Sequence, residues 1–307
     1  MNQMADIRFD DRVVIVTGAG NGLGRTYARE FAKRGGKVVV NDLGGSAFGD
    51  GADQKAADVV VEEIKAAGGE AVANYDNVLD GDKIVQTAMD SWGKVDVIIN
   101  NAGILRDKTF HKMSEQDWDL IYDVHVKGAF KVTHAAWPYM RDHNYGRVVF
   151  TTSAAGIYGN FGQTNYSMAK LGQLGMAQTL ALEGRTKNVL VNTIAPIAGS
   201  RLTETVMPKE LVDALQPEYV MPLVIKLCDE ESQESSGLFE VGAGWIGQLR
   251  WERTRGKGFS LAEGFNAEDV AEAWEEITDF TDAEHPANIA ESNRTLIRNL
   301  KTAQSDD

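Results

Sequence analysis

Short runs of apolar residues alternate with longer segments of helical periodicity along most of the chain. The runs are rich in Val and Ile and contain few polar positions, which is typical of strands buried on both faces of a parallel sheet. Strands are predicted at 12–16, 37–41, 71–74, 95–99, 147–151 and 189–194, with a candidate seventh at 238–241. Helices are predicted between them, at 23–34, 54–67, 82–91, 114–141 and 166–185. Repeated strand–helix–strand units predict a doubly wound α/β fold, a parallel sheet of about seven strands with helices on both faces.

The pattern changes after Gly244, so residues 9–244 are interpreted as one α/β domain and 245–307 as a C-terminal, mostly helical extension. The extension opens with an aromatic and basic stretch. Asn266 is then a predicted helix N-cap, with Val270, Trp274 and Ile277 on one helix face. A last short helix is predicted at 289–300. The extension is too short for a strong core of its own, so we expect it to pack on the main domain or on a dimer partner.

Composition narrows the class of protein. The 307 residues are 43% hydrophobic and 25% charged, which is ordinary for a soluble protein with a core. No apolar run approaches the ~20 residues that cross a bilayer, and the N-terminus has no signal-peptide pattern. Cys228 is the single cysteine, which favours a reducing compartment. The net charge of −14 argues against general nucleic-acid binding, and an anionic substrate would need a local basic patch.

A glycine-rich turn follows the first predicted strand and opens the first predicted helix. Its glycines have a G-x-x-x-G-x-G spacing, which differs from the commoner G-x-G-x-x-G fingerprint. The physical reason for glycine is the same, because such a turn lets a pyrophosphate approach the unpaired N–H groups of a helix N-terminus. We therefore predict a dinucleotide site, in which the cofactor-binding residues are Gly18, Asn21, Gly22, Leu23 and Gly24.

Asp42 ends the second predicted strand, 20 residues beyond the motif glycine Gly22. A carboxylate at this offset accepts hydrogen bonds from the ribose hydroxyls and repels a 2′-phosphate, which favours NAD over NADP. The alternative is a solvated turn residue. Asp76, at the end of the third strand, is a candidate acceptor for the adenine amino group, with a turn or cap role as the alternative.

Tyr166 and Lys170 lie one turn apart on a predicted helix, so their side chains share a face. A nearby Lys cation is expected to lower the pKa of the phenol, which makes Tyr166 the candidate catalytic acid/base. Ser153, 13 residues earlier at a strand end, is positioned to donate a hydrogen bond to the same substrate oxygen. Tyr158 is a rival without a Lys one turn later. The alternative for the Tyr166–Lys170 pair is an ordinary tyrosine beside a solvated lysine without a catalytic role.

Asn100-Asn101-Ala102-Gly103 follows the fourth predicted strand. With the glycine turn, Ser153 and the Tyr166–Lys170 pair, it makes residues 9–244 resemble the short-chain dehydrogenase/reductase family. The resemblance implies a Rossmann-type fold, NAD as cofactor, no metal, and assembly into dimers or tetramers. It implies catalytic roles for Ser153, Tyr166 and Lys170, and further cofactor contacts from Asn101, Ala102, Gly103, Tyr166, Lys170 and Pro196.

Two positions depart from that family's pattern. The family's fourth catalytic residue is an Asn whose main-chain carbonyl holds a water in a proton relay to the lysine; the matching position here is His125. A main-chain role survives a side-chain change, so His125 is a candidate relay residue, with an ordinary helix histidine as the alternative. The family's Pro-Gly after the sixth strand is Pro196-Ile197 here, which leaves the nicotinamide contacts in 195–203 open.

Within the family, five segments resemble the (3R)-hydroxyacyl-CoA dehydrogenase part of multifunctional β-oxidation enzymes: 39–45, 101–107, 156–162, 205–208 and 237–253. The resemblance implies a (3R)-3-hydroxyacyl-CoA substrate. A hydroxysteroid or steroid side-chain CoA substrate is the alternative, and a non-catalytic NAD-binding partner in an acyl-CoA-processing complex is the second. Candidate contacts for CoA phosphates are Arg106, Lys108, Lys112, Arg201, Lys209 and the basic residues of 250–257, although solvated surface charges are the simpler interpretation.

The location follows from weaker signals. The chain ends in Ser-Asp-Asp, which is not a peroxisomal tripeptide, and its charge is acidic. We therefore expect a cytoplasmic enzyme that is either stand-alone or part of a larger protein. A peroxisomal matrix location is the alternative if the chain is an excised domain.

Overall fold

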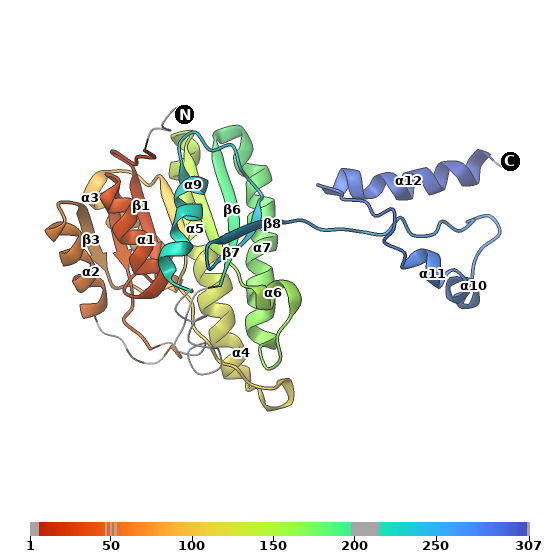
Figure 1. The fold of residues 1–307 in the computed structure, drawn as a ribbon, viewed down its shortest axis with the longest axis horizontal. Coiled ribbons are helices and arrows are strands. Elements are labelled where there is room, and N and C mark those ends of the chain that lie inside the picture. Colours follow the sequence, from red (N-terminus) through yellow and green to blue (C-terminus); the bar gives the residue numbers. More distant parts are fainter. Residues whose placement is uncertain (1–5, 47, 50, 52–53, 198–214, 306–307) are drawn as a thin grey trace. The chain divides into compact units, whose positions relative to one another are not determined.

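The apolar runs form one eight-stranded sheet in a computed structural model that describes residues 6–46, 48–49, 51, 54–197 and 215–305. The strand order is β3-β2-β1-β4-β5-β6-β7-β8 (Figure 1). The strands are β1 Val13–Thr17, β2 Lys37–Asn41, β3 Glu70–Asn74, β4 Val97–Asn100, β5 Gly146–Thr151, β6 Val189–Pro196, β7 Leu238–Gly242 and β8 Trp245–Leu249. Every pair from β3 to β7 is parallel, and this confirms the predicted doubly wound fold.

The eighth strand was not predicted. Ala243 and Gly244 have φ values of 48° and 79°, as the two central residues of a tight hairpin turn require. The turn reverses the chain, so β8 runs back along β7 as the antiparallel edge of the sheet. The sheet therefore continues past Gly244.

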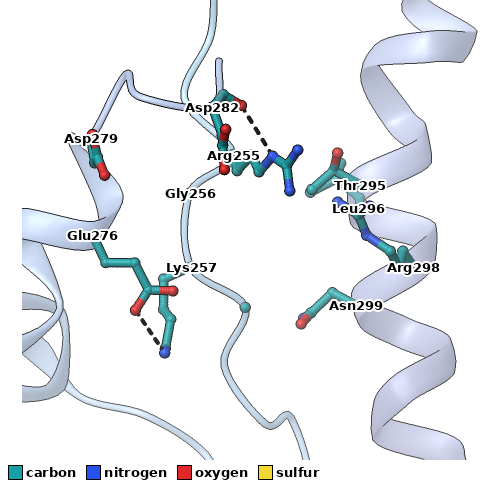
Figure 2. Close-up of a pocket in the computed structure, with 11 residues that line it drawn as sticks. Arg255, Gly256, Lys257, Glu276, Asp279, Asp282, Thr295, Leu296, Arg298 and Asn299 are labelled. Carbon is teal, nitrogen blue, oxygen red and sulfur yellow. Dashed lines mark hydrogen bonds and ion pairs between the residues drawn. The ribbon is translucent and has the colours of Figure 1, made fainter. Parts of the chain in front are cut away.

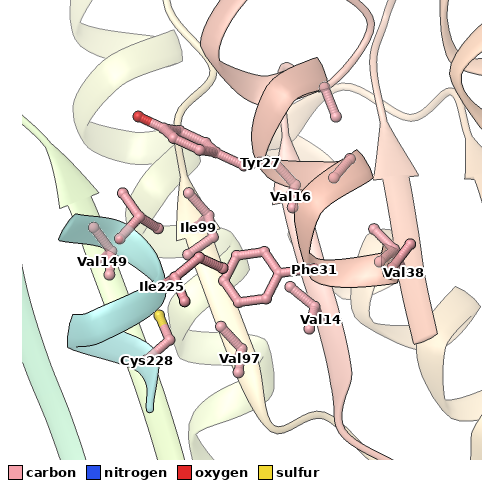
Figure 3. Close-up of a cluster of buried hydrophobic side chains, with 14 of the residues drawn as sticks. Val14, Val16, Tyr27, Phe31, Val38, Val97, Ile99, Val149, Ile225 and Cys228 are labelled. Carbon is pink, nitrogen blue, oxygen red and sulfur yellow. The ribbon is translucent and has the colours of Figure 1, made fainter. Parts of the chain in front are cut away.

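Each central strand contributes side chains to two cores, because successive residues of a strand point to opposite faces. Val14 and Val16 of β1 pack in the first core, which also contains buried residues of α1 Gly22–Lys33, α2 Lys55–Ala66 and α9 Met221–Cys228 (Figure 3). Val13 and Ile15 pack in the second, with α3 Gly81–Trp92, α5 Ala129–Asp142 and α7 Thr164–Gly184. This two-sided burial explains why the strands have so few polar positions.

Cys228, the last residue of α9, lies in the first core with no exposed surface (Figure 3). Burial raises the pKa of its thiol well above the usual value, because the thiolate would lose its hydration. Among the described residues it is a free cysteine.

The predicted long helix at 114–141 is three elements. α4 Glu115–Tyr122 and α5 are joined by a π-helix, η3 Asp123–Gly128, so the segment is helical as predicted but widens in this turn. Gly128 lets this turn pack closely on Val78, since a Cβ there would lie 2.4 Å from Cγ2 of Val78. α6 Ala154–Tyr158 and α9 were not predicted. Short 3-10 turns are η1 Val78–Asp80, η2 Phe110–Lys112, η4 Arg185–Lys187 and η6 Pro217–Tyr219. Within the described residues, no helix has the length and apolar character to span a membrane.

The chain divides into two compact units, residues 1–248 and 249–307. The second contains α10 Ala267–Glu272, α11 Trp274–Ile277 and α12 Ile289–Ser305. Asn266 is the predicted N-cap, and it forms a reciprocal capping box with Asp269. The helix predicted to continue through Trp274 is interrupted at Ala273. Arg253 ties the unit together through an ion pair of 3.0 Å with Glu284.

Phe31 offers a test of the first core. Its ring has no exposed surface and makes an edge-to-face contact with Phe9, with the ring centroids 4.7 Å apart. We expect Phe31→Ala to lower the free energy of unfolding by about 3–5 kcal/mol, because the substitution removes apolar burial and leaves a cavity. Urea denaturation measures the change. Phe110→Ala, at a ring 72% exposed, is the control and should change stability little; equal effects of the two substitutions would contradict the packing described.

Candidate active site

The predicted site residues follow the carboxyl ends of β1, β2, β4, β5 and β6, which all lie at one edge of the sheet because these strands are parallel. β1 and β4 are neighbours at the point where the strand order reverses. In open α/β sheets this is where ligands bind, between loops that leave toward opposite faces. The fold therefore brings the two halves of the predicted site together.

The turn after β1 has room only for glycine at two of its positions. A Cβ on Gly24 would lie 2.1 Å from the Gly18 carbonyl oxygen, and one on Gly18 would lie 2.8 Å from Cα of Ala102. Gly18 and Gly22 also have φ values of 64° and 52°. Asn21 is the N-cap of α1, but its side chain makes no cap hydrogen bond. The first N–H groups of α1 thus face a glycine-rich turn and are not capped by the Asn21 side chain, and the geometry fits the pyrophosphate of a dinucleotide.

The loop after β4 supports this turn. Asn101 donates from Nδ2 to the carbonyl oxygens of Thr17 and Gly18, at 3.0 Å each. The Thr17 hydroxyl in turn accepts from the backbone N–H groups of Asn101 and Ala102, at 3.1 Å each. The side chain of Asn101, a predicted cofactor-binding residue, is therefore engaged in fixing the glycine turn.

Asp42 lies at the end of β2, half-buried, and its two carboxylate oxygens accept from the backbone N–H groups of Gly20 and Gly44, each at 2.7 Å. The carboxylate is thus placed beside the glycine turn. Asp76 is held differently, because its Oδ2 accepts from Nδ2 of Asn74 at 2.7 Å. Its backbone N–H also donates to Oδ1 of Asn74, so Asp76 helps to hold the turn after β3.

Ser153, Tyr166 and Lys170 are brought together at the end of β5. Ser153 is the N-cap of α6, where its hydroxyl accepts from the Ala155 N–H at 3.2 Å, and it lies close enough to the Tyr166 phenol to lower the pKa of that phenol. Tyr166 and Lys170 lie one turn apart on α7. Lys170 is 3% exposed, and its Nζ donates to the Thr151 carbonyl at 2.6 Å. It lies 5.5 Å from the centroid of the Tyr166 ring.

The pKa of Tyr166 differs from the lowered value expected from the sequence. Burial raises the pKa of Tyr166 to about 12; the Ser153 hydrogen bond lowers it, and Asp107 raises it further. Burial also lowers the pKa of Lys170 to about 7. The expected lowering of the Tyr166 pKa by the lysine cation is therefore outweighed, because desolvation penalises phenolate and ammonium alike.

His125 lies in the π-helix and is 1% exposed. Its ring stands edge-to-face to Tyr166 with the centroids 5.3 Å apart, and its Nε2 lies 2.9 Å from the Ile104 carbonyl oxygen. A Cβ on Gly103 would lie 2.6 Å from this ring, so glycine is required there. Burial, and then the charge of Lys170, hold the pKa of His125 well below its usual value, so the imidazole is neutral. Its main-chain carbonyl accepts from Nε2 of Gln173 at 2.7 Å.

Two buried residues of the site were not identified from the sequence. Asn165 has no exposed surface; its Nδ2 donates to the Arg106 and Asp117 carbonyls at 3.2 and 3.1 Å, and its Oδ1 accepts from the Tyr166 N–H at 2.8 Å. It fixes the start of α7, and with it the phenol. Gln173 is 1% exposed and follows Lys170 by three residues, so the shared helix face was the available signal.

The remaining candidates are less central. Pro196 is the last residue of β6, whereas 198–203, Arg201 and Lys209 lie outside the described residues. Three basic residues of the C-terminal unit, Arg255, Lys257 and Arg298, line a cavity of about 470 Å³ (Figure 2). There Lys257 pairs with Glu276 at 2.8 Å, and Arg255 donates to the Asp282 carbonyl at 3.1 Å. Because carboxylates share this lining, it is not the basic patch that a CoA phosphate would need, and solvated or paired charges remain the simpler interpretation.

The sheet and the glycine turn define a dinucleotide-binding α/β oxidoreductase. Residues 12–214 match the family model described as short chain dehydrogenase. The chain therefore belongs to the short-chain dehydrogenase family, which confirms the resemblance; it is an oxidoreductase that acts on a hydroxyl group, and a nicotinamide dinucleotide is the typical cofactor of the family.

The relatives refine this placement. The chain is 57% identical to the mouse protein "Peroxisomal multifunctional enzyme type 2" over 98% of its own length and 41% of the mouse chain. The full-length enzyme of the same name from Drosophila melanogaster matches with a TM-score of 0.83 and 45% identity, over 96% of this chain and 50% of that one. The chain thus spans half or less of these two relatives. A 7α-hydroxysteroid dehydrogenase, solved with NADH and 7-oxo glycochenodeoxycholic acid, matches with a TM-score of 0.70 and 28% identity, over 78% of this chain and 98% of that one.

The neutral His125 predicts a pH dependence of stability. The unfolded chain protonates this histidine below pH ~6.5, whereas the buried ring stays neutral in the folded state, so stability falls as the pH falls. We expect His125→Asn to reduce the stability lost between pH 7.5 and 5 by up to about 2 kcal/mol. Urea denaturation at the two pH values gives the difference. The exposed His143→Asn is the control, and an unchanged loss in His125→Asn would show that the imidazole is not held neutral.

Proposed function

We propose that the chain is an NAD-dependent dehydrogenase that interconverts (3R)-3-hydroxyacyl-CoA and 3-oxoacyl-CoA. The observation that carries the proposal is the extent of the likeness to the two multifunctional enzymes. It covers 96–98% of the chain, including residues beyond the family model, which ends at 214. The motifs that resemble (3R)-hydroxyacyl-CoA dehydrogenases include 237–253, within that additional part.

The proposed chemistry uses the group at the end of β5. A nicotinamide bound beside this group would supply the acceptor for the hydride that leaves the carbon bearing the hydroxyl. Tyr166 takes the hydroxyl proton, and Ser153, which lies beside the phenol and lowers its pKa, donates to the substrate oxygen. Lys170 supports the phenolate from one turn along α7. In the reverse direction Tyr166 returns the proton to the carbonyl oxygen.

The proposed cofactor site is the turn after β1 together with Asp42. The N–H groups at the start of α1 would hold the pyrophosphate, and the Asp42 carboxylate would accept from the ribose hydroxyls. The contacts proposed for Asn21, Leu23, Asp76, Ala102, Gly103, Lys170 and Pro196 rest on the family resemblance. The preference for NAD over NADP follows from the negative charge of Asp42.

The substrate and catalytic group can be tested together. We expect NADH formation from NAD with the (3R) epimer of a medium-chain 3-hydroxyacyl-CoA and none with the (3S) epimer. Tyr166→Phe should lower turnover by about 10²–10⁴-fold without changing NADH affinity, since it removes the proton acceptor. Tyr158→Phe is the matched control, because that phenol is 65% exposed and bonds Glu240 at 3.0 Å.

Other results of this assay would select the alternatives. Turnover of a hydroxysteroid or its CoA ester without the acyl-CoA would favour the steroid reaction that the neighbour solved with 7-oxo glycochenodeoxycholic acid suggests. NADH binding without turnover of any substrate would favour a non-catalytic partner. Retained activity in Tyr166→Phe would exclude this residue as the acid/base.

Asp42 provides the test of cofactor choice. We expect Asp42→Ala to lower the ratio of kcat/KM for NAD to that for NADP by about ten-fold or more, because the substitution removes the charge that repels a 2′-phosphate. It also removes one hydrogen bond to Gly20 in the glycine turn and one to Gly44 in the loop after β2, which should weaken both cofactors alike, so the ratio isolates the charge effect. Asp82→Ala, an exposed carboxylate on α3, controls for net charge. An unchanged ratio in the Asp42 variant would rule out the assignment.

Assembly and location are also proposals. A homodimer or homotetramer is expected from the family resemblance. The mouse relative carries "peroxisomal" in its name, which favours the peroxisomal matrix, while the cytoplasmic location expected from the sequence stays a prediction.

A further inference from the structure

A chain of buried polar contacts runs from Lys170 to the π-helix through Gln173. The amide oxygen of Gln173 lies 3.5 Å from Nζ of Lys170, and its Nε2 donates to the His125 carbonyl at 2.7 Å. The side chains of Lys170 and Gln173 both come from α7, while His125 comes from η3. All three residues are at most 3% exposed, so this connection forms away from bulk water.

The orientation of the Gln173 amide follows from its two neighbours. The His125 carbonyl needs a donor, and the Lys170 ammonium needs an acceptor. A flipped amide would set its oxygen against a carbonyl and its NH₂ group against an ammonium. Each end of Gln173 is therefore matched to one partner, in a buried position where an unmatched polar group is costly.

We propose that Gln173 is a positioning residue of the site: its side chain joins the Lys170 ammonium to the main chain at His125 and holds the ammonium on the side of Tyr166. This inference rests on the proposed dehydrogenase function. The family resemblance assigns the His125 carbonyl a role in a proton relay to the lysine. In this chain that carbonyl already accepts a hydrogen bond from Gln173. The Gln173 side chain therefore links His125 to Lys170.

An amide is neither an acid nor a base near neutral pH, so Gln173 transfers no proton. Its contribution is a dipole aimed at the lysine. Burial lowers the pKa of Lys170 to about 7, and the acceptors that its ammonium contacts are the Thr151 carbonyl, at 2.6 Å, and the Gln173 oxygen, at 3.5 Å. A hydrogen bond to the charged form favours it, so Gln173 shifts Lys170 toward the ammonium.

The other charged or titratable groups around Lys170 are few within the described residues. Tyr166 faces it from the same helix, and His125 is affected by its charge from η3. Asp107 acts on Tyr166 from the loop after β4. β5 contributes a main-chain carbonyl. No carboxylate among the described residues pairs with Lys170, so its pKa depends on the neutral acceptors around its ammonium.

The test measures the lysine itself, without substrate. The Lys170 ε-carbon resonance is followed by NMR from pH 5 to 11 in protein labelled with [¹³Cε]lysine, and Lys170→Arg assigns it. Gln173→Met, which keeps the length but removes both polar ends, should lower the titration midpoint by about one pH unit. Gln173→Glu should raise the midpoint above that of the wild type, because a carboxylate favours the ammonium more strongly. Gln178→Met, the same change further along α7, should leave it unaltered.

Turnover gives a second readout. We expect Gln173→Met to lower kcat about five- to ten-fold with little change in KM, and the alkaline limb of the kcat–pH profile to move in the same order as the NMR midpoints. If the role of Gln173 were only structural, Gln173→Met would lower activity or stability, but the alkaline limbs would not follow the order of the NMR midpoints.

Each outcome is decisive. Equal midpoints in the wild type, Gln173→Met and Gln173→Glu would overturn the inference whatever the substrate assays show. If Gln173→Met does not fold, a Gln173→Glu midpoint at or below that of the wild type would overturn it. Shifted midpoints in a protein that does not turn over 3-hydroxyacyl-CoA would sustain the role of Gln173 and reject the proposed substrate.

Discussion

The parallel pairing of β1 with β4 is the constraint on which the rest of the site depends. It places Thr17 beside the Asn101 loop, where one hydroxyl accepts from two backbone N–H groups. From there contacts continue without interruption: Asn101 fixes the glycine turn, and Gly103 packs on the His125 ring. The predicted cofactor residues after β1 and the predicted catalytic residues around Tyr166 are thus joined by one set of contacts, so a change in β4 would alter the geometry of both.

The buried group around Tyr166 and Lys170 is stabilised, among the described residues, by hydrogen bonds to main-chain carbonyls rather than by ion pairs. Lys170 donates to Thr151, and Asn165 donates to two carbonyls in other segments. Dipoles of this kind satisfy the buried donors but neutralise no charge, so desolvation decides the pKa of Lys170 and of Tyr166. Their proton distribution is therefore sensitive to any charge brought beside them, as the acid/base chemistry of a dehydrogenase requires.

The sequence predicted the central fold well because two-sided burial leaves a strong record: the Val and Ile runs coincide with the seven strands from β1 to β7 within about two residues at each end. Its misses have local causes. Gly242–Gly244 resembles the end of a domain but contains a hairpin turn, because Ala243 adopts a positive φ. The π-helix adds a residue to one turn without disturbing the apolar pattern. Asn165 and Gln173 also depend on partners 48 residues away, the Asp117 and His125 carbonyls, which spacing along one helix does not reveal; only the contact of Gln173 with Lys170 has a signal in that spacing.

Cys228 is a buried probe of local opening in the folded chain. A thiol with no exposed surface and a raised pKa reacts with an alkylating reagent only after α9 separates from the sheet. The rate of its modification therefore reports how often that helix opens, and comparing it with the rate of global unfolding would show whether α9 moves alone or only with the whole sheet. Since this is the single cysteine of the sequence, the signal comes from one defined place in the core.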